Sequence, residues 1–400
     1  MKVNDWRSPL RSGRSSTTAE APRPRLGEIF TPALVLDRGK LRRNAERILA
    51  RAVKLGVACR PHLKTAKSYE VARLLIDPSD PAITVSTLAE AEYFFAHGIE
   101  DILYAVGLAP VKFPRVAALL DRGCRLSVIL DSCEIAQAVS TFFLDGPPLR
   151  VLIEIDVDGH RAGVSPDDPV LMRIAAALSR AGAVQLSGVM THAGKSYDAR
   201  SDVMLRDYAE RERAGAIKAA QILRSAGFAS PVVSVGSTPT FLHADSLDGV
   251  TEVRVGVAAF GDLYQAGIGC HEISDIALSV IASVISHDRA HNRLIVDAGF
   301  LALSHDRSTA TLAVDQKYGL ICDVETCTPF DDMIVVATNQ EHGLVSTRSG
   351  APVDFTRFPL GSAVRILPNH ACATAAAHGC YHVVEGSPEV ISVWNRVNGW

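Results

Sequence analysis

The chain has 400 residues, of which 48% are hydrophobic and 21% are charged. This composition is typical of a globular protein with a large core in one or two domains. The formal net charge of −3 argues against a nucleic-acid partner, and no apolar run is long enough to span a membrane. The eight cysteines lack the spacing of a disulfide framework, so we expect reduced thiols and a cytoplasmic location.

The N-terminal 25 residues differ from the rest of the chain. They are rich in Arg and Ser and lack the apolar core of a secretory signal. We interpret residues 1–25 as a mobile tail. An organelle transit peptide would have a similar composition and is the less favoured alternative.

From Thr31 onward, short Val/Ile/Leu-rich runs alternate with longer amphipathic runs. A strand followed by a helix, repeated, predicts parallel βα units, and about eight such units close a barrel. We therefore expect an α/β fold, a (β/α)8 TIM-type barrel, over residues 26–270. The runs lie at 33–36, 41–55, 82–85, 88–97, 102–105, 111–122, 126–130, 151–155, 170–181, 185–190, 201–226, 231–235 and 251–259.

After about residue 271 the pattern changes to short strands without long helical runs. This pattern predicts a second, mainly β domain over residues 271–400. The expected strands include 277–285, 293–296, 311–314, 333–337, 363–367 and 381–385.

Residues 61–67, Pro-His-Leu-Lys-Thr-Ala-Lys, follow an apolar run at 55–59. An amine is a nucleophile at neutral pH only when desolvation or neighbouring positive charge destabilises its ammonium form. Lys67, Arg60 and a position at a strand end could supply both effects, which makes Lys64 a candidate Schiff-base lysine. Taken alone, two lysines three apart after a strand are more often a solvated turn.

Some three hundred residues later, His370 and Cys372 lie two positions apart in a segment that we expect to be extended. Alternation along a strand would then direct both side chains to the same face. Nitrogen and sulfur donors suit a zinc-like ion, so the pair is a candidate metal site. An incidental His-x-Cys pair is the alternative.

These two segments are part of a set of motifs that follow one another in a characteristic order along the chain. Through this set of motifs, the chain from about Thr31 to Trp400 resembles the D-serine dehydratase and D-threonine aldolase family. Members of that family are pyridoxal-phosphate enzymes with an alanine-racemase-like barrel, the type III fold of such enzymes. The resemblance rests on residues 61–67, 154–156, 159–164, 191–197, 233–240, 252–262, 297–299, 341–343 and 368–374.

The resemblance implies a role for each candidate residue. Lys64 would form the Schiff base with the cofactor, and Ser237 and Thr238, with the backbone amides of Gly256 and Val257, would hold the cofactor phosphate. The remaining candidates would lie beside the cofactor ring or meet the substrate carboxylate, and they are His62, His192, Tyr197, Arg161 and Arg254.

Structural readings of these residues stay open at this stage. A half-buried core tyrosine is the alternative for Tyr197, and a hydrogen-bonded core histidine is the alternative for His62 and His192. For Arg161 and Arg254 the alternative is an ion pair at the surface or at a strand end.

The His-x-Cys pair favours one reaction within the family. In the family that the chain resembles, aldolases tend to carry His-x-Asp at these positions, whereas dehydratases carry His-x-Cys. We therefore expect a pyridoxal-phosphate- and metal-dependent dehydratase that converts a D-3-hydroxy amino acid into a 2-oxo acid and ammonia. Zinc is the expected metal and manganese an alternative. A D-threonine-type aldolase, a racemase on the same scaffold and a non-catalytic cofactor-binding protein are the rival readings.

The chain departs from the family pattern near the expected pocket at Ala66, Met190, Lys195 and Val257–Ala258. If Lys195 points into the pocket, a second carboxylate on the substrate becomes plausible, which makes 3-hydroxy-D-aspartate a rival to D-serine and D-threonine. The resemblance also implies a homodimer.

Overall fold

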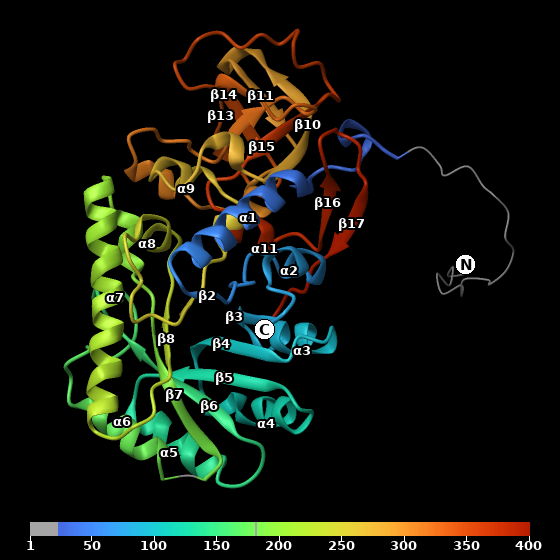
Figure 1. The fold of residues 1–400 in the computed structure, drawn as a ribbon. Helices are drawn as coiled ribbons and strands as arrows, with labels where there is room; N and C mark the ends of the chain where they lie inside the picture. Colours follow the sequence, from blue (N-terminus) through green and yellow to red (C-terminus); the bar gives the residue numbers. More distant parts are fainter. Residues whose placement is uncertain (1–22, 181) are drawn as a thin grey trace, which may run out of the picture.

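Two sheets form the framework of the protein, as described by a computed structural model for residues 23–180 and 182–400 (Figure 1). An eight-stranded parallel sheet has the order β2-β9-β8-β7-β6-β5-β4-β3, and a nine-stranded sheet has the order β11-β14-β13-β12-β15-β10-β1-β16-β17. The first is the expected α/β barrel, and the second belongs to a mainly β domain beside it. The boundary expected at residues 270 and 271 stays a prediction.

Each barrel strand is followed by a helix or a 3-10 turn, which is the βα repeat expected from the sequence. The strands are β2 (Ala58–Cys59), β3 (Ala82–Val85), β4 (Asp101–Gly107), β5 (Arg125–Leu130), β6 (Leu149–Ile155), β7 (Val184–Thr191), β8 (Val232–Val235) and β9 (Glu252–Val253). The helices are α1 (Arg38–Lys54), α2 (Tyr69–Leu75), α3 (Leu88–Ala96), α4 (Phe113–Asp121), α5 (Cys133–Phe142), α6 (Val170–Leu178), α7 (Asp202–Ser225) and α8 (Thr238–His243).

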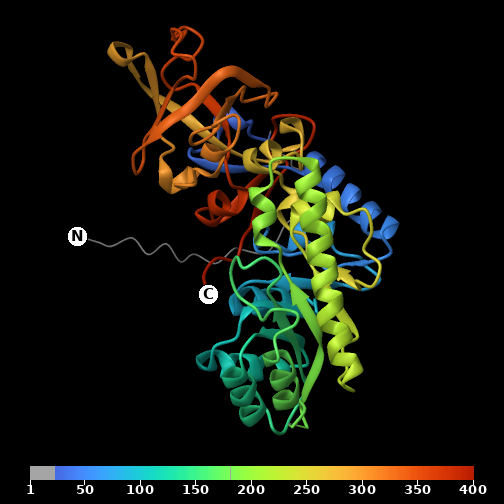
Figure 2. The ribbon, with the colours of Figure 1, turned by 90° about the vertical axis from the view of Figure 1, so that its left-hand side faces the viewer.

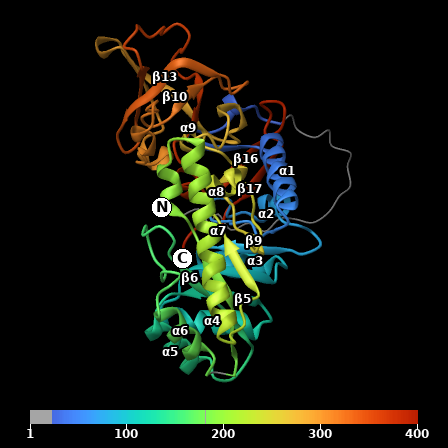
Figure 3. The same cartoon turned by 60° about the vertical axis from the view of Figure 1, so that its left-hand side comes forward.

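Several of these helices begin where a short polar side chain caps the first turn. Thr87, Ser132 and Ser201 accept a hydrogen bond from the backbone amide three residues later, at the starts of α3, α5 and α7. Such caps satisfy amides that have no partner within the helix. Helix α7, the longest, runs along the outside of the barrel towards the β domain (Figures 2 and 3).

The barrel closes between β2 and β3. Leu63 N donates to Thr84 O over 2.8 Å, and Thr84 N donates to Pro61 O over 2.9 Å, so residues 61–63 extend β2 alongside β3. Closure removes both open edges of the parallel sheet. It also sets the start of the Lys64 loop at the rim of the barrel.

The β domain is built around the long strand β10. Its strands are β10 (Leu278–Asp288), β11 (Arg293–Val296), β12 (Leu320–Cys322), β13 (Pro329–Thr338), β14 (Gly343–Thr347), β15 (Ala363–Leu367), β16 (Cys380–Val384) and β17 (Ser392–Asn395). The short helices α9 (Leu263–Gly267), α10 (Phe300–Leu303) and α11 (Ala371–Ala376) lie between the barrel and this sheet or at its loops.

Two strand predictions were wrong. The run at 33–36 does form a strand, β1 (Ala33–Asp37), but it pairs with β10 and β16 of the β domain and not with a barrel strand. A short apolar run carries no information on which sheet it joins. The run at 311–314 is not a strand, because a 3-10 helix spans Ser308–Thr311 and leads directly into a loop.

The interior of the barrel has its own small core. Leu103, Ile129, Leu152 and Met190 are buried together, one from each of β4 to β7, while their strand neighbours pack outward against the helices. This alternation is what strands in a closed barrel require. Among the described residues, no helix is long and apolar enough to cross a membrane.

Gly188 in β7 is required by close backbone packing. Its φ is +144°, and a Cβ placed there would lie 1.9 Å from Val232 O of β8. We expect Gly188→Ala to lower the free energy of unfolding by about 2–4 kcal/mol, measured by urea titration. The control is Gly107→Ala in β4, where a Cβ would meet nothing within 4 Å. Equal stability of the two variants would contradict this account.

Candidate active site

A cavity of about 430 Å³ opens at the carboxyl ends of the barrel strands, where reactive groups gather in such barrels. All twelve catalytic, cofactor-binding and metal-ligand candidates from the sequence line it, including the two from the β domain. They are His62, Lys64, Arg161, His192, Tyr197, Ser237, Thr238, Arg254, Gly256, Val257, His370 and Cys372.

The loop that carries Lys64 is held from the β domain. The Tyr381 hydroxyl lies 3.1 Å from Thr65 O and 2.8 Å from Ala66 O, and the Arg396 guanidinium donates to the same two carbonyls. Among the described residues, no hydrogen bond or ion pair engages the Lys64 amine. The amine therefore faces the cavity on a loop whose backbone is fixed.

The positive neighbours expected for Lys64 are themselves paired. Lys67 Nζ lies 3.1 Å from the buried Glu90 carboxylate, and Arg60 binds Asp101 and Glu252 over 2.7 and 2.8 Å. The expectation that Lys67 and Arg60 act on Lys64 through unbalanced charge is wrong, because each charge is matched by a carboxylate nearby.

His370 and Cys372 lie at the start of a helix and not on the strand that we expected. His370 is extended and precedes α11, and Cys372 lies in the first turn of that helix. His370 Nδ1 lies 3.0 Å from Asp306 Oδ2, and Cys372 Sγ lies 2.9 Å from Thr65 Oγ1. The prediction of an extended segment was wrong, but the helix start still brings both side chains into the cavity.

Electrostatics in this cluster favour a thiolate. Burial would raise the pKa of the Cys372 thiol, but His370 and then Lys64 hold it below its usual value. Burial would lower the pKa of His370, but Asp306 and Cys372 raise it to about 11. The thiolate is the form of cysteine that binds metals. Asp306 fixes the imidazole through Nδ1, so Nε2 is the nitrogen left for a ligand.

The donor set fits a metal held by few protein ligands. Within residues 23–180 and 182–400, no group of three or more His, Cys, Asp or Glu side chains is arranged as a metal site. An ion bound by His370 and Cys372 would therefore complete its coordination with water or substrate, as catalytic sites do.

Free hydrogen-bond donors face the opposite part of the cavity. In the described chain, the backbone amides of Gly256 and Val257 donate no hydrogen bond. Gly256 packs so closely on the loop after β2 that a Cβ would lie 2.5 Å from His62 O. Thr238 and Ser237 add hydroxyl groups at the same end. Unpaired amides beside hydroxyls suit a phosphate.

The two histidines are neutral. Burial, followed by the charge of Lys64, holds the pKa values of His62 and His192 well below the usual value. His62 Nδ1 accepts from the Lys64 amide over 3.4 Å, and His192 Nδ1 donates to Gly236 O. Each ring therefore has a fixed tautomer beside the lysine.

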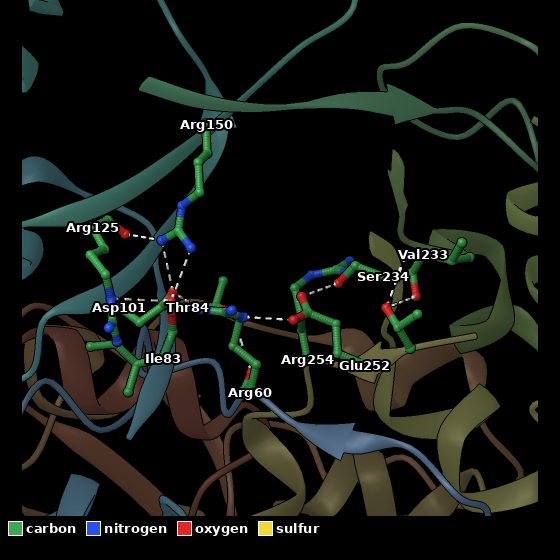
Figure 4. Close-up of polar contacts among 11 residues, drawn as sticks. Arg60, Ile83, Thr84, Asp101, Arg125, Arg150, Val233, Ser234, Glu252 and Arg254 are labelled. Atoms are coloured by element: carbon green, nitrogen blue, oxygen red, sulfur yellow. Dashed lines mark hydrogen bonds and ion pairs between the residues drawn. The ribbon is translucent and has the colours of Figure 1, made fainter. Parts of the chain in front are cut away.

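Arg254 is buried, 5% exposed, and is therefore not at the surface. Figure 4 shows it among its polar neighbours. Arg254 donates to Ser234 Oγ and Thr191 O, each over 2.5 Å. Ser234 in turn donates to Glu252 over 2.6 Å, and Arg60 joins Glu252 to Asp101. This chain of polar groups satisfies a buried guanidinium, which makes it a fixed part of the cavity floor.

Tyr197 lies in a 3-10 helix, Gly194–Asp198, and its ring is stacked on Tyr264 at 6.3 Å. Burial raises the pKa of its phenol, so the hydroxyl remains protonated. Lys195 on the same turn is exposed and does not line the cavity. Arg161 is exposed at the rim of the cavity and has no ion-pair partner in the described chain.

Sequence reasoning missed several cavity residues that carry chemistry: Glu154, Asp198, Tyr264, Gln265, Asp306 and Ser308. Asp306 lies in a loop that the sequence does not connect with residues 368–374. Its one available signal is the Asp-x-Ser turn, in which Ser308 bonds to Asp306, and such turns are common on surfaces.

Comparisons with known proteins agree with this geometry. A family model described as the N-terminal domain of alanine racemase matches residues 36–264, and one described as a serine dehydratase domain matches residues 277–384. D-threo-3-hydroxyaspartate dehydratase of a Delftia species is 48% identical over 92% of this chain and 98% of its own. Its solved structure superposes with a TM-score of 0.90 over 94% of this chain and all of that one.

More distant relatives include both dehydratases and aldolases. D-serine dehydratase of Dictyostelium discoideum is 30% identical over 94% of this chain and 98% of its own. D-threonine aldolase of an Arthrobacter species is 28% identical over 88% of each. Solved structures of D-threo-3-hydroxyaspartate dehydratase include a histidine-to-alanine and a cysteine-to-alanine variant at positions two apart, and the cysteine variant is described as metal-free.

His62 makes stability depend on pH. The folded apoprotein keeps the ring neutral to well below pH 6.5, whereas the unfolded chain takes up a proton near pH 6.5. Stability is therefore lost as the pH falls below that value. Between about pH 7.0 and 5.5, urea titration should give the parent protein a loss about 1 kcal/mol larger than that of His62→Asn. Parallel losses would contradict a neutral His62.

Proposed function

Since the chain belongs to the D-serine dehydratase family with the alanine-racemase-like fold, we propose that it is a pyridoxal-phosphate- and metal-dependent dehydratase. Its substrate would be a D-3-hydroxy amino acid, and its products a 2-oxo acid and ammonia. The supporting observation is that the lysine, the anion-binding donors and the His370–Cys372 pair share one cavity.

Lys64 would carry the cofactor and then act as the base. When bound, pyridoxal phosphate would acidify the Cα proton, and a metal ion would make the β-hydroxyl a better leaving group. Lys64 Nζ, which has no partner in the described chain, is the amine that can take the Cα proton. His62 and His192, both neutral, add no positive charge beside that amine.

His370 Nε2 and Cys372 Sγ would hold the metal, with Asp306 fixing the imidazole from behind. Nitrogen and thiolate donors favour zinc, and manganese is the alternative. Two separate variants of D-threo-3-hydroxyaspartate dehydratase support this assignment, because the histidine substituted in one and the cysteine substituted in the other, metal-free one have the spacing of His370 and Cys372.

The remaining residues would orient the cofactor and substrate. Ser237 and Thr238, with the amides of Gly256 and Val257, would bind the phosphate. Arg254 and Tyr197 would border the ring, and Arg161 at the rim is suited to a substrate carboxylate, since its guanidinium is not committed to an ion pair in the described chain.

We favour 3-hydroxy-D-aspartate as the substrate over D-serine and D-threonine. The relative that acts on D-threo-3-hydroxyaspartate shares 48% identity, whereas the D-serine dehydratases share 30% or less. Lys195 is no longer an argument for this preference, because its side chain lies outside the cavity lining. A homodimer and a cytoplasmic location stay predictions of the same proposal.

Aldol cleavage on the same scaffold is the second candidate, because aldolases are among the relatives and use the same substrate class. Incubating the loaded enzyme with 3-hydroxy-D-aspartate, D-serine and D-threonine separates the two. We expect a 2-oxo acid and ammonia, with kcat/KM at least roughly tenfold higher for 3-hydroxy-D-aspartate than for D-serine. A chelator should abolish turnover. Glycine with an aldehyde as the main products would establish the aldolase instead.

Cys372→Ala should release the metal and leave the cofactor in place. We expect metal affinity to fall at least about a hundredfold, measured by metal content after dialysis, while the cofactor absorbance is retained. Cys380→Ala is the matched control, since Cys380 is also half-buried but lies in β16 away from the cavity lining. A Cys372→Ala protein that keeps one metal per chain would refute the assignment.

A further inference from the structure

Helix α7 carries one buried carboxylate that the proposed reaction does not use. Glu212 is 2% exposed and lies on the apolar face of α7, between Ala209 and Ala216. A carboxylate in such a place is costly unless hydrogen bonds compensate its desolvation. Its presence on this face therefore requires an explanation in terms of what it binds.

Glu212 binds three segments at once. Its Oε1 accepts from Ala193 N over 2.9 Å and from Gly236 N over 3.3 Å, and its Oε2 accepts from Thr240 Oγ1 over 2.5 Å. These atoms belong to the loop after β7, the loop after β8 and the helix α8. Ser237 and Thr238 lie between the last two of these contacts along the chain.

A set of three buried hydroxyls continues from Thr240 towards the cavity. Thr240 donates its proton to Glu212, and Ser196 donates its proton to Ala193 O over 2.7 Å. Ser237 Oγ lies 2.8 Å from Thr240 Oγ1 and 2.9 Å from Ser196 Oγ. Because each hydroxyl has a single proton and those of Thr240 and Ser196 are donated elsewhere, Ser237 donates to one of these two hydroxyls and not to a carboxylate or carbonyl. Ser237 lines the cavity, so its proton can turn to a bound anion.

We propose that Glu212 is a positioning residue for the cofactor phosphate: it ties the β7 and β8 loops and α8 together so that the Ser237 hydroxyl and the Thr238 segment face that group. The inference rests on the proposed function, which assigns the phosphate to Ser237 and Thr238. Glu212 itself does not line the cavity, and it acts through the backbone and hydroxyls that it holds.

The test compares two aldehydes that differ only in the phosphate. Apoprotein with Glu212→Ala is titrated with pyridoxal phosphate and with pyridoxal, and both dissociation constants are measured by absorbance. We expect the affinity for pyridoxal phosphate to fall about 10- to 100-fold, as for loss of buried hydrogen bonds, and that for pyridoxal to change less than about threefold. Glu210→Ala on the exposed face of α7 should change neither, since Glu210 is exposed and contacts only Arg213 among charged side chains of the described chain.

Thr240→Val keeps the shape of the side chain and removes one Glu212 contact, so it carries the test even if Glu212→Ala does not fold. It should lower the affinity for pyridoxal phosphate by about three- to tenfold and leave the affinity for pyridoxal nearly unchanged. Equal losses for both aldehydes in either variant would mean general loosening and overturn the inference. A parent protein that binds both aldehydes equally well would refute the phosphate assignment itself, and the Glu212 inference with it.

Discussion

The carbonyl groups of Thr65 and Ala66 bind side chains of the other domain, and the candidate active site depends on this contact. Tyr381 and the buried Arg396 supply the donors, and Val397 N adds a bond to Lys67 O over 2.7 Å. No carboxylate pairs with Arg396 in the described chain, so backbone carbonyls satisfy its guanidinium. The loop of Lys64 is thus a barrel loop whose conformation is set by the β domain.

The same contact links the two chemical functions of the cavity. Thr65, one residue after Lys64, binds Cys372 through its hydroxyl, and Cys372 contacts His370. Thr65 is therefore the link between Lys64 and the two metal-ligand candidates, His370 and Cys372, which lie some three hundred residues later in the sequence. A shift of one domain against the other would change the distance between Lys64 and the His370–Cys372 pair.

Sequence reasoning found what depends on local pattern and residue type. The βα repeat predicted the barrel, local pattern indicated Lys64, His370 and Cys372, and the family resemblance implied the other nine candidates that line the cavity. What it missed depends on long-range contacts. The ion pairs of Lys67 and Arg60 with Glu90, Asp101 and Glu252 join segments that no local pattern connects. Asp306 contacts His370 across 64 positions.

The local sequence pattern also cannot distinguish a strand from the first turn of a helix at every position. The segment around His370 is extended at one residue and helical at the next, so period-2 alternation described it wrongly while still pairing the correct side chains. The exposed Lys195 was misjudged for a related reason: neighbours on a tight 3-10 turn, such as Tyr197, point in different directions.

Strand β1 has a consequence for how the chain folds during synthesis. Its residues Leu34, Val35 and Leu36 are fully buried only between β10 and β16, which are translated some 240 and 340 residues later. The barrel strands lie between them in the sequence, so the ribosome delivers the barrel while an apolar strand still lacks both neighbours. Such a strand is a template for wrong pairing. For most of its translation, the nascent chain therefore carries one apolar segment whose two partner strands have not yet been made.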